Sequence, residues 1–97
     1  MKVIEYEPQF WFFLTDGNEY YIDVNCSYSF VGFGRLIRLS EMETNEYRKR
    51  GKEYLNLLAN DIQYYALSKY KERNIVGEND KQIQNAIAEF NKEKNFR

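Results

Sequence analysis

Apolar and polar residues alternate in short runs over the first 39 residues, a pattern typical of β-strands. Four runs predict strands: KVIEYE (2–7), QFWFFLT (9–15), EYYIDVN (19–25) and a stretch within YSFVGFGRLIRL (28–39). In the last of these, Gly32 and Gly34 indicate a bulge or a close backbone approach. The pattern predicts an antiparallel sheet of three to four strands.

The turn sequence Asp16-Gly17-Asn18 sets the expected register of the central hairpin, because Gly, Asn and Asp accept positive φ. A three-residue loop pairs Leu14 with Tyr20. It gathers one apolar face, made of Phe10, Phe12, Leu14, Tyr20, Ile22 and Val24. A two-residue loop would mix apolar and polar positions, so the three-residue loop is preferred.

With this register, the reverse face of the hairpin carries Trp11, Phe13, Glu19, Tyr21 and Asp23. A terminus, the following helix or a second subunit could cover this face, and covering by the chain itself is the commoner outcome. The alternative is an exposed patch that binds a partner. In that case Trp and Tyr are the usual interface anchors, and the two carboxylates would select a basic partner.

Residues 40–97 have the spacing of helices. Ser40-x-x-Glu43 is a capping box, and the helix that follows is expected to reach about Arg73, with an interruption near Gly51. Its core face is formed by Tyr47, Gly51, Tyr54, Leu55, Leu58, Ile62, Tyr65 and Ala66.

A second apolar side of this helix, formed by Leu57, Tyr64 and Leu67, needs its own covering element. The C-terminal segment supplies a candidate helix after a turn at Gly77, with an apolar stripe at Ile83, Ala86, Ile87 and Phe90. The expected fold is therefore one α+β domain over residues 1–97, strand-rich over 1–39 and helical over 40–97. A long helix and a C-terminal helix are expected on one side of the sheet.

The amino-acid composition limits which chemical functions the protein can have. The 97 residues include 14 Lys and Arg, 15 Asp and Glu and no His, giving a net charge of −1. Without His there is no Ser–His or Cys–His pair, and no motif indicates an enzyme, a metal site or a cofactor. One cysteine, Cys26, excludes an internal disulfide and fits a reducing cytoplasm. We expect a cytoplasmic protein with no membrane segment.

The one basic cluster, Arg48-Lys49-Arg50-Gly51-Lys52, has two interpretations. Its side chains splay around a helix, and Glu43 and Glu46 can pair with them, so a solvated face is the default. A contact with an anion or RNA is the alternative. The acidic sheet half argues against nucleic-acid binding, since it would repel phosphates.

In size and layout, the chain resembles bacterial immunity proteins, the small cytoplasmic partners that neutralise polymorphic or contact-dependent toxins. The segments that carry the resemblance are FWFFLTDGNEYYIDVN, FGRLIRLS and EYLNLLANDIQ. The resemblance implies stoichiometric inhibition of a toxin, often a basic nuclease domain, and transfers no contact residue.

The sequence therefore favours a binding protein over an enzyme, with Trp11, Phe13, Glu19, Tyr21 and Asp23 as the hypothetical partner-binding residues. Two other functions stay open. A homodimeric structural or regulatory protein would use the same face or the Leu57–Tyr64–Leu67 side of the helix. A nucleic-acid accessory protein would use the basic cluster.

Overall fold

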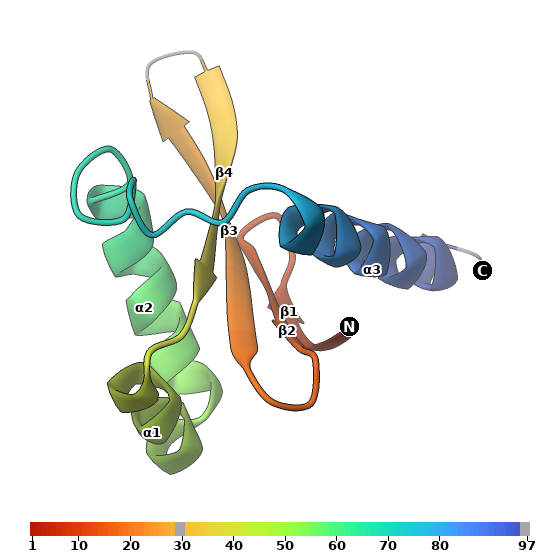
Figure 1. Ribbon diagram of the computed structural model, residues 1–97, viewed down its shortest axis with the longest axis horizontal. Coiled ribbons are helices and arrows are strands. Elements are labelled where there is room, and N and C mark those ends of the chain that lie inside the picture. Colours follow the sequence, from red (N-terminus) through yellow and green to blue (C-terminus); the bar gives the residue numbers. More distant parts are fainter. Residues whose placement is uncertain (29–30, 96–97) are drawn as a thin grey trace.

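Four antiparallel strands form one sheet in the computed structural model, which describes residues 1–28 and 31–95 (Figure 1). The strands are β1 (Lys2–Glu7), β2 (Trp11–Thr15), β3 (Tyr20–Tyr28) and β4 (Val31–Arg38), and they neighbour one another in chain order. The sequence prediction of an antiparallel sheet is confirmed, including the edge strand at residues 2–7. Ser29 and Phe30 of the predicted third strand lie outside the described residues.

The helical half contains α1 (Glu41–Arg50), α2 (Lys52–Tyr64) and α3 (Glu78–Asn95). The capping box is present, because the Glu43 N–H donates to Ser40 Oγ (3.2 Å) and the Ser40 N–H donates to Glu43 Oε1 (2.8 Å). Gly51, with φ of 65°, separates α1 from α2.

The predicted extension of the helix to Arg73 is wrong, since α2 ends at Tyr64 and residues 65–73 form successive turns. These turns bring Tyr70 back into the core, where its ring is buried. The Tyr70 hydroxyl donates to Asp61 Oδ2 (2.5 Å).

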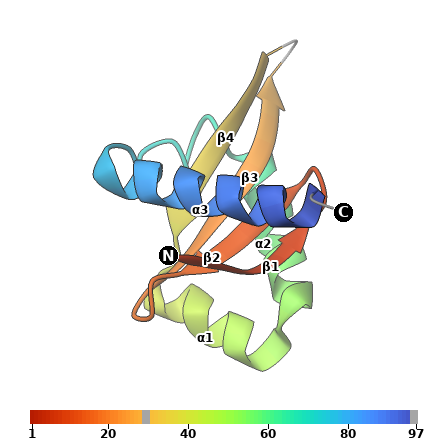
Figure 2. The ribbon, with the colours of Figure 1, turned by 90° about the vertical axis from the view of Figure 1, so that its right-hand side faces the viewer.

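The helices cover both faces of the sheet, with α1 and α2 on one face and α3 on the other (Figures 1 and 2). The expectation that both helices share one side is wrong. The cluster between the sheet and α1 and α2 is formed by sheet residues and by residues of α2 and the turns after it. The first group is Trp11, Phe13, Ile22, Val24, Cys26, Ile37 and Leu39, and the second is Leu55, Leu58, Ala59, Ile62, Ala66 and Tyr70. Against α3 lie Leu14, Tyr21, Leu36, Ile83 and Ile87. Each face of the sheet thus has its own apolar cluster.

The hairpin register explains this arrangement. Leu14 pairs with Tyr21 and Thr15 with Tyr20, one residue away from the predicted pairing of Leu14 with Tyr20. The observed turn, residues 16–19, is one residue longer than predicted. Asp16 stabilises it, because its Oδ1 accepts hydrogen bonds from the N–H groups of Asn18 (2.9 Å) and Glu19 (2.8 Å). A one-residue shift moves all side chains of one strand to the other face relative to its neighbour.

Candidate functional site

Trp11, the central residue of the predicted partner-binding face, lies inside the protein. Its side chain is 1% exposed and packs in the cluster under α2. The indole Nε1–H donates to Asn56 Oδ1 (3.0 Å), so the polar atom of the ring is satisfied within the chain. Of the two outcomes left open for this residue, covering by the chain itself is the one observed, and the alternative of an exposed Trp11 that binds a partner is wrong, because α2 covers the sheet face on which Trp11 lies.

Phe13 and Tyr21 are also buried, with exposed fractions of 0% and 4%, and they lie on opposite faces of the sheet. The Phe13 ring stacks on Tyr20, with 5.4 Å between ring centroids. The Tyr21 hydroxyl donates to Asp16 Oδ2 (3.2 Å). Burial, followed by the nearby Asp16 charge, raises the pKa of Tyr21. The three predicted aromatic anchors therefore do not form a common surface.

The two predicted carboxylates reach the surface at different places. Glu19 is exposed in the hairpin turn. Asp23 is half-buried on the α3 face, where Gln84 Nε2 donates to Asp23 Oδ2 (3.1 Å) and lies 3.4 Å from Asp80 Oδ1. Burial raises the pKa of Asp23, the Gln84 hydrogen bond opposes this, and the Asp80 charge adds to it. Of the five predicted residues, only these two are not buried.

Four apolar side chains are exposed on α2 and in the turn after it. We call them the α2 stripe, and they are Leu57, Tyr64, Tyr65 and Leu67. Leu57 is 50% exposed, Tyr64 80% and Leu67 51%. The sequence prediction that the C-terminal helix covers these positions is wrong, because α3 packs on the other face of the sheet.

Local contacts order part of the stripe. The Tyr64 and Tyr65 rings meet edge to face with centroids 4.7 Å apart, and Lys69 Nζ lies 4.7 Å from the Tyr65 centroid. Leu57 and Tyr64 are seven residues apart on one helix, which places them on the same side and roughly 10 Å apart along the axis. The pattern of apolar positions had marked Leu57, Tyr64 and Leu67, but it had placed Tyr65 on the core face, whereas Tyr65 is 40% exposed. The packing of α3 on the other face of the sheet leaves these side chains uncovered.

The basic cluster is largely neutralised by neighbouring carboxylates. Lys49 and Arg50 contact Glu46 at 4.0 and 3.8 Å. Lys52 Nζ lies 3.0 Å from Glu7 Oε2 of β1. These contacts support the interpretation of a solvated helix face.

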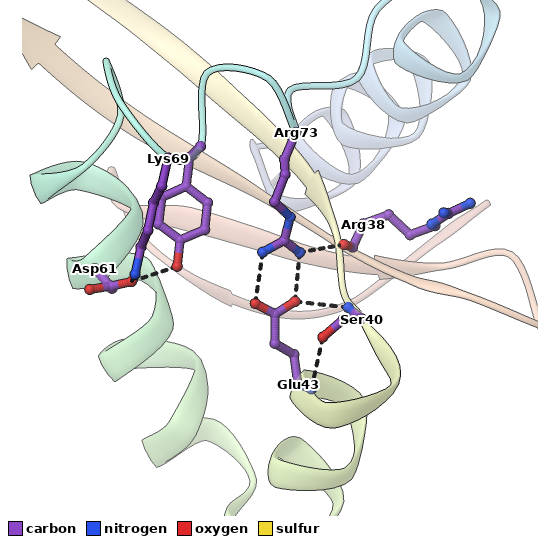
Figure 3. Close-up of polar contacts among 7 residues, drawn as sticks. Arg38, Ser40, Glu43, Asp61, Lys69 and Arg73 are labelled. Atoms are coloured by element: carbon purple, nitrogen blue, oxygen red, sulfur yellow. Dashed lines mark hydrogen bonds and ion pairs between the residues drawn. The ribbon is translucent and has the colours of Figure 1, made fainter.

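Arg73 ties three elements together (Figure 3). Its guanidinium binds both carboxylate oxygens of Glu43, at 2.7 and 3.0 Å, and also donates to the Arg38 carbonyl (2.9 Å). Burial alone would raise the pKa of Glu43, but the hydrogen bonds from Arg73 and from the Ser40 backbone outweigh it and lower that pKa. This network joins the start of α1, the end of β4 and the segment after α2, and its role is structural.

The remaining reactive groups give no chemical constellation. Cys26 is a buried free thiol, and burial raises its pKa, which disfavours the reactive thiolate. Over residues 1–28 and 31–95, no three Cys, Asp or Glu side chains are placed to hold a metal ion. Within the same ranges, no helix is both long and apolar enough to span a bilayer.

Comparisons with known proteins give no relative: no family model, no curated protein and no solved structure matches the chain.

Proposed function

We propose that the protein is a small binding protein of the immunity type, which neutralises a cognate toxin by stoichiometric binding through the α2 stripe. The observation that carries this proposal is the exposure of Leu57, Tyr64 and Leu67 on a folded domain whose sheet is already covered on both faces. Contiguous exposed apolar side chains are characteristic of interaction sites. Tyr is also among the residues that contribute most to interfaces.

The charges around the stripe have both signs. Glu53, one turn before Leu57, is exposed and lies 3.2 Å from Arg50, and Lys69 lies against the Tyr65 ring. Rim charges of this kind steer association more than they add affinity. The order of a strand hairpin, a further strand and a capped helix, on which the resemblance to immunity proteins depends, is retained in the fold.

The test is co-expression in a sensitive bacterial host with the toxin candidate encoded by a neighbouring reading frame. We expect restored growth and a one-to-one complex in size-exclusion chromatography. The double variant Tyr64→Ala/Leu67→Ala should lose both, because anchors at an interface centre contribute about 2 kcal/mol or more each. Met42→Ala is the matched control, since Met42 is apolar and 76% exposed on α1, away from the stripe. Rescue by the folded double variant equal to that by the control would refute the role of the stripe.

A homodimer through the same stripe is the second candidate, favoured by the apolar character of the surface. Light scattering of the purified protein separates the two functions. A tight dimer that the double variant dissociates would assign the stripe to self-association instead of toxin binding.

A further inference from the structure

β4 lies at one edge of the sheet, and the backbone groups on its outer side have hydrogen-bond partners along only half of the strand. In an antiparallel pair, every second residue turns its backbone groups away from the neighbouring strand. The bond from the Leu39 N–H to the Tyr20 carbonyl (2.9 Å) sets the phase. The outward residues of β4 are therefore Gly32, Gly34, Leu36 and Arg38.

The half of this edge next to α1 is covered by the segment that follows α2. The Leu36 N–H donates to Asn74 Oδ1 (2.8 Å), and the Leu36 carbonyl accepts from the Ile75 N–H (2.8 Å). The Arg38 carbonyl accepts from Arg73. The chain thus adds a short strand-like partner to its own sheet, which ends at Leu36.

The other half has no such partner among the described residues. Gly32 and Gly34 are exposed, and the β3–β4 hairpin extends past the helices into solvent (Figures 1 and 2). Proteins normally protect a sheet edge with charges or bulges. β1, at the opposite edge, has both, with an irregular register at Ile4 between Val3 and Glu5. The Gly32–Gly34 stretch has neither.

A depression of about 240 Å³ lies where the covered and free halves of the edge meet. Its walls include Gly34, Asn74, Asp23, Asp80 and Gln84. A Cβ on Gly34 would stand 3.3 Å from Asp23 Oδ1, so the absence of a side chain keeps this space open. A side chain of a strand added beside Gly34 would enter the depression, because successive residues of a strand alternate between the two faces.

The depression is acidic, because Asp23 and Asp80 line it, and it therefore favours a basic side chain on the added strand. Asp23 and Asp80 share the single amide of Gln84, and neither carboxylate has a cationic partner among the ion pairs of the described residues. Burial and the mutual proximity of the two acids disfavour the charged form of Asp23, whose pKa is raised. A Lys or Arg would relieve both effects.

We propose that the free edge of β4 at Gly32 and Gly34 binds an extended segment of a partner protein as an added strand, with a Lys or Arg of that segment bound to Asp23 and Asp80. Main-chain hydrogen bonds would supply affinity and the acidic depression would supply selectivity, as in other cases of strand addition. The site is separate from the α2 stripe and does not depend on the proposed function.

The test uses NMR of the ¹⁵N-labelled full chain with the capped peptide Thr-Val-Lys-Val-Thr. We expect saturable shifts at the amides of Gly32 and Gly34 and at the Gln84 side chain. The control peptides are Thr-Val-Glu-Val-Thr and the Lys peptide with N-methyl groups on alternate residues, which cannot pair with a strand. Asp23→Asn should weaken binding of the Lys peptide by roughly threefold to tenfold while the fold persists. Gly34→Val should abolish it.

Three results would overturn the proposal. The first is the absence of shifts at millimolar Lys peptide. The second is equal binding of the Lys, Glu and N-methylated peptides. The third is a concentration dependence of the Gly32 and Gly34 amides without peptide, which would show that a second copy occupies the edge. Loss of toxin binding through the α2 stripe would leave all these measurements unaffected.

Discussion

Replacing Glu43 by Gln tests how much one side chain contributes to holding the helical half on the sheet. The Glu43 carboxylate accepts two hydrogen bonds from Arg73 and one from the Ser40 N–H. Its side chain is 15% exposed. Gln keeps the shape and one acceptor oxygen, but it loses the charge and turns an amide NH₂ group toward a guanidinium.

The expected cost follows from this geometry. Hydrogen bonds to charged groups contribute about 1.5–3 kcal/mol each in favourable cases. Because the Arg73 side chain is 36% exposed, water compensates part of the loss. We expect Glu43→Gln to lower the free energy of unfolding by about 2 kcal/mol, which for a domain of this size corresponds to a Tm lower by roughly 8–16 °C.

The assay is urea unfolding at pH 7, with Glu46→Gln as the matched control on the same helix. Glu46 contacts Lys49 and Arg50 at 4.0 and 3.8 Å on the surface, so its loss should cost about 0.5 kcal/mol or less. A double-mutant cycle with Arg73→Gln should give a coupling energy of about 1–2 kcal/mol. Equal effects of Glu43→Gln and Glu46→Gln, with no coupling to Arg73, would refute the reasoning.

The pH dependence supplies a second check. The folded-state pKa of Glu43 lies below its ordinary value of 4.5, so the unfolded chain takes up the proton first on acidification. The stabilisation by Glu43 is therefore complete above about pH 5 and is lost as the pH falls through the folded-state pKa. The stability difference between the wild type and Glu43→Gln should shrink toward pH 3, and a difference that is constant from pH 7 to pH 3 would contradict this account.

Three further predictions concern the hairpin and the core. Asp16→Ala removes the acceptor of two turn N–H groups and should cost about 1 kcal/mol in urea unfolding. Trp11→Phe creates a small cavity and removes the hydrogen-bond donor of the Asn56 side-chain oxygen. It should lower the free energy of unfolding by about 2 kcal/mol without changing partner binding. Cys26 should resist iodoacetamide in the native protein and react fully in denaturant, as measured by intact mass; rapid native labelling would show that it is accessible.

Local sequence signals predicted the elements well. Alternation gave the strands, Ser40 and Glu43 gave the start of the first helix, and the spacing of Ile83 and Ile87 gave the buried side of α3. Each of these signals depends on residues a few positions apart, which the chain itself brings into contact. Gly51 and Gly77 also mark the breaks between helices, where both adopt positive φ.

The candidate site could not be predicted in the same way, because it depends on a single register and on one long-range placement. In the hairpin every position from Phe10 to Leu14 is apolar. The predicted register, with Leu14 opposite Tyr20, and the observed one, with Leu14 opposite Tyr21, therefore both give an apolar face, and the pattern does not choose between these two. The choice was made by Asp16, whose carboxylate stabilises a longer turn.

That choice also accounts for the exposed side of α2. With apolar residues on both faces, the sheet needs a cover on each, and α3 is the only described helix left for the second face once α1 and α2 occupy the first. Because α3 covers Leu14, Tyr21 and Leu36, no described helix is left to cover the α2 stripe. The exposure of the α2 stripe is thus a consequence of where the strands are apolar, and the partner-binding surface that we propose lies on the helix and not on the sheet.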